Sequence, residues 1–274
     1  MAETKVKVIR PRSSRLDLGL GEIWEYRELL FFLVWKDIKI RYKQSVVGAA
    51  WAVIQPLFTM MIFTFLLGNL VKVPTDGIPY PIFSYTGLVL WTYFANVVNQ
   101  GSHSLIGNAS LVTKVYFPRA LIPLATCVAG LLDLGIASII LVGMMFYFHV
   151  SLTIMIVLFI VPVIMIFILA TGLTFWLSAV NVRYRDVVFL VPFFIQLLLF
   201  ATPVLYATST FPESLTWTFY INPLVGIMTL QRGIWLGTAV DWTIVGCSVL
   251  ITAVVFIVGL YYFRVYERDF ADVI

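Results

Sequence analysis

Long apolar runs dominate the 274-residue sequence and limit what the chain can fold into. A helix needs roughly 20 mainly apolar residues to cross the hydrocarbon core of a bilayer. The runs are continuous rather than alternating, which excludes the strands of a membrane β-barrel. Six runs of about the required length are expected to span a membrane: Val46–Val71, Ile82–Val98, Ala120–Phe148, Leu152–Val180, Val187–Tyr206 and Thr243–Phe263.

The composition leads to the same conclusion. Hydrophobic residues make up 61% of the chain and charged residues only 12%, whereas soluble domains are about half apolar and about a quarter charged. A globule in water could not hide so much apolar surface, so lipid is the expected solvent. Cytosolic enzymes, secreted disulfide scaffolds and disordered tails are thereby excluded. Cys127 and Cys247 lie within apolar runs and are expected to act as small hydrophobic residues.

One apolar stretch, Trp217–Leu236, does not fit a simple span because it contains Asn222, Pro223 and Arg232. An arginine near the centre of an isolated span costs about 2.5–3.5 kcal/mol. We therefore expect a re-entrant helical hairpin over about residues 208–240, which enters and leaves the membrane on one side. The expected fold is an all-α integral membrane protein with six transmembrane helices and this hairpin between the fifth and sixth spans.

The positive charge is concentrated before the first span. Residues 1–45 hold ten Lys/Arg and six acidic residues, which accounts for the whole net charge of +4. With the N-terminus inside, 16 of the 18 basic residues fall on the cytoplasmic side, and Lys72 and Arg232 fall outside. This asymmetry predicts that both termini are cytoplasmic. Since a membrane-topology signal explains the basic charge, no nucleic-acid partner is expected.

The segment before the first span is expected to be a helix. Within residues 22–45, acidic residues and then lysines recur at spacings of three or four, and the apolar centre Leu29–Trp35 is too short to span. We expect an amphipathic interfacial helix on the cytoplasmic leaflet, with a helix packed beneath the bundle as the alternative. Residues 1–21 would form a basic tail, residues 46–264 one six-span domain, and residues 265–274 a cytoplasmic tail.

Residues for intramembrane catalysis are scarce. The expected spans hold one acidic residue, Asp133, and the two histidines, His103 and His149, lie at span ends. No metal-ligand or nucleophile constellation is expected, and no G-x-x-x-x-G-K-[ST] sequence is present to bind ATP. Asp133 fits equally well as a group hydrogen-bonded to a neighbouring helix and as a pore-facing group. If transport is driven by ATP, the ATPase is a separate chain.

Aromatic side chains within the spans have two interpretations. Their faces could stack on the apolar faces of sugar rings and so line a channel. For any single residue, lipid contact or packing between helices is the simpler interpretation. The channel-lining candidates, which include the lone acid, are Trp51, Phe58, Trp91, Tyr93, Phe193, Phe194 and Asp133.

Several short strings occur in a recognisable order: Arg41–Ser45 (RYKQS), Phe117–Arg119 (FPR), Asn181–Asp186 (NVRYRD), Thr202–Tyr206 (TPVLY) and Asn222-Pro223. With these strings and this hydropathy, the chain resembles the permease subunit of bacterial type-2 ABC exporters of cell-surface polysaccharides. That group includes exporters of O-antigen, capsular polysaccharide and teichoic acid. The resemblance extends from about Glu22 to the end of the chain.

The resemblance implies a homodimer of this permease joined to two copies of a separate nucleotide-binding ATPase subunit. That partner would bind ATP and Mg, and this chain would hold no cofactor. A lipid-linked polysaccharide would pass through a channel at the dimer interface. The family also implies residence in the bacterial inner (plasma) membrane, contact with membrane lipids, an interfacial helix and re-entrant helices on the outer side.

Two cytoplasmic segments are ATPase-coupling candidates on this resemblance. The loop Asn108–Arg119 resembles a short coupling helix, and it is unusually apolar for a plain solvated connection. For Asn181–Asp186 the alternative is positive-inside anchoring, together with capping of the fifth span by Asp186. The candidate residues are Asn108, Leu111, Val112, Lys114, Val115, Tyr116, Phe117, Arg119, Arg183 and Arg185.

Further roles follow from the same resemblance. Arg41 and Arg119, at headgroup level, could bind phosphates of a lipid carrier, although membrane topology explains them nearly as well. The family has an outer gate near the re-entrant segment, whereas ordinary helix termination would leave the same prolines. The gate candidates are Pro203, Tyr206, Asn222, Pro223 and Arg232.

Two other functions stay open at this point. One is a type-2 ABC exporter of a small hydrophobic drug or lipid, which needs a lateral cleft rather than a continuous wide path. The other is a membrane-embedded enzyme or scaffold of glycan biosynthesis, which would depend on Asp133, His103 or His149.

Overall fold

The structure is a computed structural model that describes residues 20–43, 50–150 and 154–270. All regular structure within these ranges is helical. The longer helices are α2 (Arg27–Lys43), α3 (Trp51–Phe63), α4 (Tyr80–Ser102), α7 (Leu121–Tyr147), α8 (Ile160–Arg183), α9 (Val187–Ala201), α11 (Pro223–Leu236) and α12 (Trp242–Tyr266). The short helices are α1 (Leu20–Glu25), α5 (Ser104–Gly107), α6 (Ala109–Lys114) and α10 (Trp217–Ile221). A π-helical segment, Thr64–Leu70, extends α3, and short 3₁₀ segments occupy Ile154–Phe159, Thr208–Thr210 and Glu213–Leu215.

Four helical segments of the described chain are long and apolar enough to cross a membrane: Trp51–Leu70, Leu121–Tyr147, Val157–Arg183 and Trp242–Tyr266. The predictions of an all-helical fold and of multiple spans are therefore confirmed. Two of the six expected spans correspond to helices of a different character. Helix α4 is long but less apolar, and α9 is apolar but has only 15 residues.

Helix α4 lies at the centre of the bundle, packed against α3, α7, α8, α9 and α11. Its side chains Tyr85, Leu90 and Phe94 are fully or almost fully buried in the bundle. Because protein rather than lipid surrounds the helix, polar side chains are tolerated where the helix itself satisfies them. Thr86, which is fully buried, donates to the carbonyl of Ile82 at 2.7 Å. This environment explains why α4 carries a weaker apolar signal than the other long helices.

Helices α8 and α12 form the most extensive helix pair, and glycine allows their backbones to meet. A Cβ placed on Gly259 would lie 2.1 Å from the carbonyl oxygen of Gly172, and one on Gly172 would lie 2.6 Å from the Cα of Phe256. Small residues at such contacts are typical of helix association in membranes, where close backbone approach supplies much of the packing energy.

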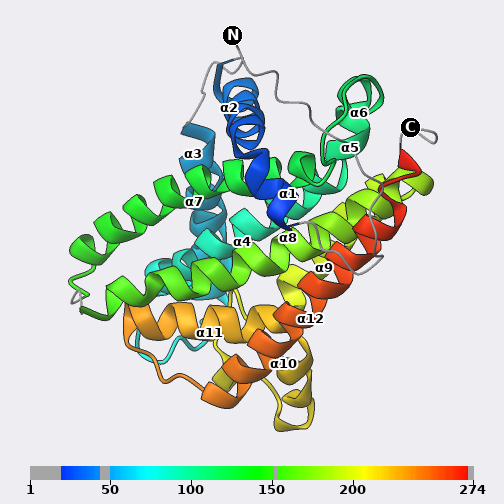
Figure 1. The fold of residues 1–274 in the computed structure, drawn as a ribbon. Helices are drawn as coiled ribbons and strands as arrows, with labels where there is room; N and C mark the ends of the chain where they lie inside the picture. The colour runs from blue at the N-terminus through cyan, green and yellow to red at the C-terminus, as the bar shows by residue number, and fades with distance from the viewer. Residues whose placement is uncertain (1–19, 44–49, 151–153, 271–274) are drawn as a thin grey trace.

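The short helices, together with α2 and α11, gather at two opposite ends of the bundle (Figure 1). Helices α1, α2, α5 and α6 lie at one end, together with the last turns of α12; we call this the α6 end. Helices α10 and α11 lie at the other end, which we call the α11 end. The long helices connect the two ends.

The N-terminal helix is divided between α1 and α2 and packs against α7. Leu33 is buried in a cluster with Leu105 and Phe117 near the α6 end. Other apolar side chains of the same segment, including Trp24 and Phe32, are largely exposed. The segment therefore packs against the bundle, as the alternative interpretation expected. It also presents exposed aromatics of the kind that an interfacial helix directs toward lipid.

The fifth apolar run is shorter as a helix than predicted. Val187–Tyr206 was expected to be continuous, but α9 ends at Ala201, and Thr202–Tyr206 turns away from the helix. Pro203 has no N–H to continue the ladder. The carbonyls of Pro203, Val204 and Tyr206 instead accept hydrogen bonds from Arg232.

The α8–α12 contact gives a direct test of the packing. We expect Gly259→Ala to lower the free energy of unfolding by about 1–3 kcal/mol, because the added methyl group must push two backbones apart. Gly246→Ala is the matched control, since Gly246 lies on the same helix and a Cβ added there would meet nothing within 4 Å. Thermal unfolding of the purified variants measures both effects, and equal melting temperatures would contradict the close contact.

Candidate functional site

The loop between α4 and α7 combines a buried inner side with an exposed outer side. Val112 and Phe117 are 2% and 6% exposed and pack into the cluster around Leu33. Val115 and Tyr116, between them, are 51% and 77% exposed. Two apolar side chains thus project from a well-anchored loop beside the exposed Lys114. This is a surface of the kind that a protein partner covers.

The predicted coupling residues therefore divide into two groups. Lys114, Val115 and Tyr116 form the exposed surface, whereas Val112 and Phe117 hold the loop in place from inside. Leu111 is half-buried and packs against the same inner cluster.

The side-chain amide of Asn108 makes two hydrogen bonds, one to α5 and one to α2. Its amide nitrogen donates to the carbonyl of Ser104 at 2.8 Å. Its oxygen accepts a hydrogen bond of 2.6 Å from Lys36 Nζ on α2. The loop between α4 and α7 and the N-terminal helix are therefore joined by a direct polar contact.

Arg119 joins the same loop to the end of α12. Its backbone N–H donates to Glu267 Oε1 at 2.8 Å, and its guanidinium donates to the backbone carbonyl of Glu267. The other carboxylate oxygen of Glu267 accepts from Arg264 at 2.7 Å, and Arg264 also lies 3.8 Å from Glu22 on α1. Glu267 and Arg264 together thus connect the loop, the end of α12 and α1. Sequence analysis missed the role of Glu267 because the acid lies in what was expected to be a tail.

The second coupling segment follows α8. Arg183 is exposed, with its guanidinium carbon 5.9 Å from the ring centre of Tyr184 and 6.0 Å from that of Tyr266. Arg185 is exposed as well. Asp186 stands at the N-cap position of α9, but its side chain makes no capping hydrogen bond. The alternative that Asp186 caps the fifth span is therefore wrong.

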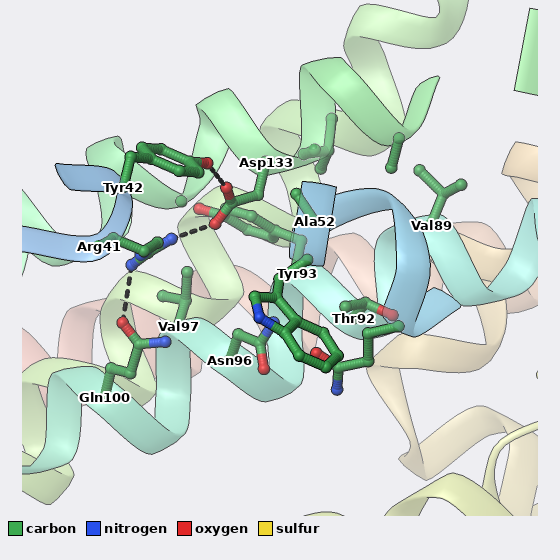
Figure 2. A pocket seen from close by; sticks show the side chains of 15 residues that line it. Arg41, Tyr42, Ala52, Val89, Thr92, Tyr93, Asn96, Val97, Gln100 and Asp133 are labelled. Atoms are coloured by element: carbon green, nitrogen blue, oxygen red, sulfur yellow. Dashed lines mark hydrogen bonds and ion pairs between the residues drawn. The ribbon is translucent and has the colours of Figure 1, made fainter. Parts of the chain in front are cut away.

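Asp133 is hydrogen-bonded to a neighbouring helix. Its two oxygens accept from the guanidinium of Arg41 and the hydroxyl of Tyr42, both on α2. The second arm of the Arg41 guanidinium donates to Gln100 Oε1 on α4 at 2.7 Å. Figure 2 shows Arg41 lying between Asp133 and Gln100, so that α2, α4 and α7 meet at one ion pair.

These contacts bear on Tyr42 and on the two lipid-phosphate candidates, Arg41 and Arg119. Burial, reinforced by the hydrogen bond to Asp133, raises the pKa of Tyr42 above its ordinary value, so the phenol remains a donor. Arg41 was a candidate for binding lipid phosphate, but Asp133 already neutralises its charge. The second lipid-phosphate candidate, Arg119, is likewise engaged, because its guanidinium and its backbone N–H both donate to Glu267.

The α11 end is organised around Arg232. This side chain is 5% exposed, and its guanidinium donates to the carbonyls of Pro203 and Val204, both at 2.6 Å. The guanidinium carbon also lies 3.8 Å from the ring centre of Phe83 at the start of α4. Arginine holds three segments together here because its planar fork can serve several carbonyls at once.

The other predicted gate residues surround this contact. Asn222 is the N-cap of α11, accepting from the N–H of Leu224 at 3.1 Å and donating to Thr202 Oγ1 at 2.9 Å. Pro223 occupies the first turn of α11. The half-buried Tyr206 stacks on Phe211, with ring centres 5.9 Å apart.

The channel-lining candidates differ in exposure. Trp51 and Phe58 on α3, and Phe193 and Phe194 on α9, are each between 55% and 57% exposed. Trp91 and Tyr93 on α4 are 6% and 3% exposed, and the Tyr93 hydroxyl donates to the carbonyl of Cys127 at 3.1 Å. The exposed aromatics thus lie on α3 and α9, whereas those on α4 belong largely to the core.

Metal-ion chemistry has no assembled ligand set in the described residues: no three His, Cys, Asp or Glu side chains form a group that could hold an ion. Cys127 is buried and Cys247 is partly buried, and both are free thiols.

The fold and these contacts define a multi-pass helical membrane protein with an anchored loop that exposes apolar side chains at one end. Residues 28–236 match the family model described as ABC-2 type transporter, and the chain belongs to that family.

Several named proteins are similar to this chain over most of its length. An O-antigen export system permease protein RfbA of Klebsiella pneumoniae is 28% identical over 264 residues, covering 96% of this chain and 100% of the relative. A protein of the same name from Myxococcus xanthus is 32% identical over 222 residues, covering 78% and 82% of the two chains. The polysialic acid transport protein KpsM of Escherichia coli is 21% identical over 243 residues, covering 85% and 91%.

Substitution of Arg232 tests whether this side chain stabilises the α11 end. We expect Arg232→Leu to lower the free energy of unfolding by about 1–3 kcal/mol for each of the two buried carbonyls left without a donor. Arg185→Leu is the control, because Arg185 is exposed. Thermal unfolding of the two variants measures the difference. A melting temperature for Arg232→Leu equal to that of the control would contradict the assigned role.

Proposed function

We propose that this chain is the membrane-spanning subunit of an ATP-driven exporter that moves a lipid-linked polysaccharide out of the cytoplasm. Membership of the ABC-2 transporter family supports the transporter class. The relatives named for O-antigen export and polysialic acid transport favour a polysaccharide over a small hydrophobic drug. The observation that supports a separate partner ATPase is the exposed Val115–Tyr116 surface on an anchored loop.

In this proposal the protein acts as a homodimer with two copies of the ATPase in a bacterial inner membrane. The α6 end faces the cytoplasm with both chain termini, in agreement with the clustering of basic residues before the first span. Helices α4 and α9 complete six spans with the four strongly apolar segments. Residues 208–240, which contain α10 and α11, form the re-entrant segment at the outer surface.

The partner subunit would supply ATP binding and hydrolysis with Mg. This chain would transmit the resulting movement through its own contacts. The Asn108–Lys36 hydrogen bond would carry displacement of the docking loop to α2, and the Arg119–Glu267 contacts would carry it to α12. Arg183 and Arg185, at the same end, would add a second contact to the ATPase.

The exposed faces of α3 and α9 would form the path for the polymer between two protomers. These faces carry Trp51, Phe58, Phe193 and Phe194 and are covered by little of the described chain. Aromatic faces give a polymer a broad apolar contact that tolerates sliding. Opening at the outer end would depend on the segment held by Arg232, which includes Tyr206, Asn222 and Pro223.

The docking surface is tested by a pair of equally exposed tyrosines. Tyr116 is 77% exposed at the α6 end, and Tyr147 is 78% exposed at the end of α7. We expect Tyr116→Ala to reduce both copurification of the partner ATPase and the amount of surface polysaccharide by about tenfold. Loss of a central aromatic anchor commonly costs about 1–2 kcal/mol or more of binding free energy. Tyr147→Ala should leave both unchanged. Equal behaviour of the two variants would contradict docking at α6.

The transmission step is tested separately at Glu267. We expect Glu267→Gln to retain the ATPase in the complex but to export at least about threefold less polysaccharide per ATP hydrolysed, because the Arg119 and Arg264 contacts lose a charged acceptor. Asp269→Asn removes an exposed carboxylate two residues away and serves as the control. An unchanged ratio of export to hydrolysis in Glu267→Gln would contradict this route.

A further inference from the structure

A cavity of about 200 Å³ lies where α2, α3, α4 and α7 meet, beside the Arg41–Asp133 ion pair (Figure 2). Its walls include Trp51 and Gln55 from α3, and a stripe of polar residues from α4. It lies toward the α6 end of the bundle, at the base of the aromatic face of α3. Neither the docking loop nor the contacts of Arg232 explain this group of side chains.

The charge in this cavity is already balanced. The guanidinium of Arg41 is engaged by Asp133 on one side and by Gln100 on the other. An anionic ligand would have to displace the Asp133 carboxylate and leave it beside a second negative charge. The cavity therefore disfavours a phosphate group, although Arg41 considered alone would attract one.

The polar groups that remain available are neutral. Thr92, Asn96 and Gln100 recur every four residues and so share one face of α4. Within the described chain, the side chains of Gln55, Thr92 and Asn96 make no hydrogen bond, although each lines the cavity. A primary amide offers two donors and an acceptor, and a hydroxyl offers both functions. These groups can therefore serve a ligand rich in hydroxyls.

The apolar walls complement these donors and acceptors. Trp51 is 55% exposed, so its ring face is accessible, and the buried Tyr93 closes the inner side. Aromatic faces match the C–H faces of a sugar ring, while planar amides match its hydroxyls. The volume lies below the roughly 300–1,000 Å³ typical of sites for drug-sized ligands, which limits the occupant to about one ring.

We propose that this cavity is a binding subsite for a single neutral, hydroxyl-rich sugar residue and not for the phosphate of a lipid carrier. The inference rests on the proposed function, of which it identifies the part of the substrate recognised here. The Arg41–Asp133 pair acts by positioning: it fixes Gln100 and holds α2 against the cavity, so that the amides remain directed toward the ligand.

Saturation-transfer difference NMR of the purified full-length protein in a detergent without a sugar headgroup tests the subsite. The probes are a panel of neutral methyl glycosides, each at up to about 20 mM. Inorganic pyrophosphate, which has no carbon-bound protons, is followed on the same samples by ³¹P line broadening. We expect at least one glycoside to bind. Asn96→Leu should weaken that binding about fivefold, the equivalent of one lost hydrogen bond. Asn99→Leu, the same change on another face of α4 outside the cavity lining, should not.

A second variant separates lost space from lost polarity. Ala52 lines the cavity from α3, and Ala52→Phe should fill it without removing a polar group. It should weaken glycoside binding at least as much as Asn96→Leu. The subsite is overturned if no glycoside binds, if Asn96→Leu and Asn99→Leu behave alike, or if pyrophosphate binds and Asn96→Leu abolishes its binding.

Export in cells distinguishes failure of the subsite from failure of the proposed function. The wild-type gene is returned to a deletion strain and surface polysaccharide is measured. If export is restored but glycoside binding does not depend on Asn96, the subsite alone is wrong. If the wild-type gene does not restore surface polysaccharide, the proposed function is wrong, and the subsite proposal that rests on it is overturned too.

Discussion

A charged group inside a membrane bundle needs a partner within the protein, and this constraint organises the structure. An unpaired charge in hydrocarbon costs several kcal/mol. Asp133 is therefore held by Arg41 and Tyr42, and Arg232 by backbone carbonyls at the opposite end. Each of these partnerships joins segments distant in sequence. The few charges that a membrane tolerates thus act as fixed points for the helices around them.

These fixed points divide the molecule into two functional ends joined by long helices. At the α6 end, polar contacts link the loop between α4 and α7 to α2 and to the end of α12. At the α11 end, Arg232 ties α11 to the start of α4 and to the turn after α9. Helix α4 runs between the two ends through the core. In the proposed exporter, a movement imposed at the ATPase would reach the outer segment through packed helices.

Much of the architecture could be predicted from the sequence, because apolar length and charge asymmetry report directly on the bilayer. The boundary of α9 could not, because it depends on carbonyls that turn toward an arginine about 30 residues further along. The pairing of Arg41 with Asp133 was equally hidden: an acid in a span must have a partner, but spacing along the chain does not identify it. The i, i+4, i+8 spacing of Thr92, Asn96 and Gln100 was visible in the sequence as a polar face that begins on the expected span Ile82–Val98 and continues just past its end. The sequence does not show that α3 lies opposite this face and that the two helices line one cavity.

The proposed exporter moves a lipid-linked polysaccharide only when a separate ATPase drives this chain. The most direct measurement reconstitutes the purified permease in proteoliposomes with and without its partner ATPase and follows translocation of the lipid-linked glycan. We expect translocation that requires ATP, Mg and both subunits. Translocation by the permease alone, or ATP-driven movement of a small lipid but not of the glycan by the complete complex, would contradict this function.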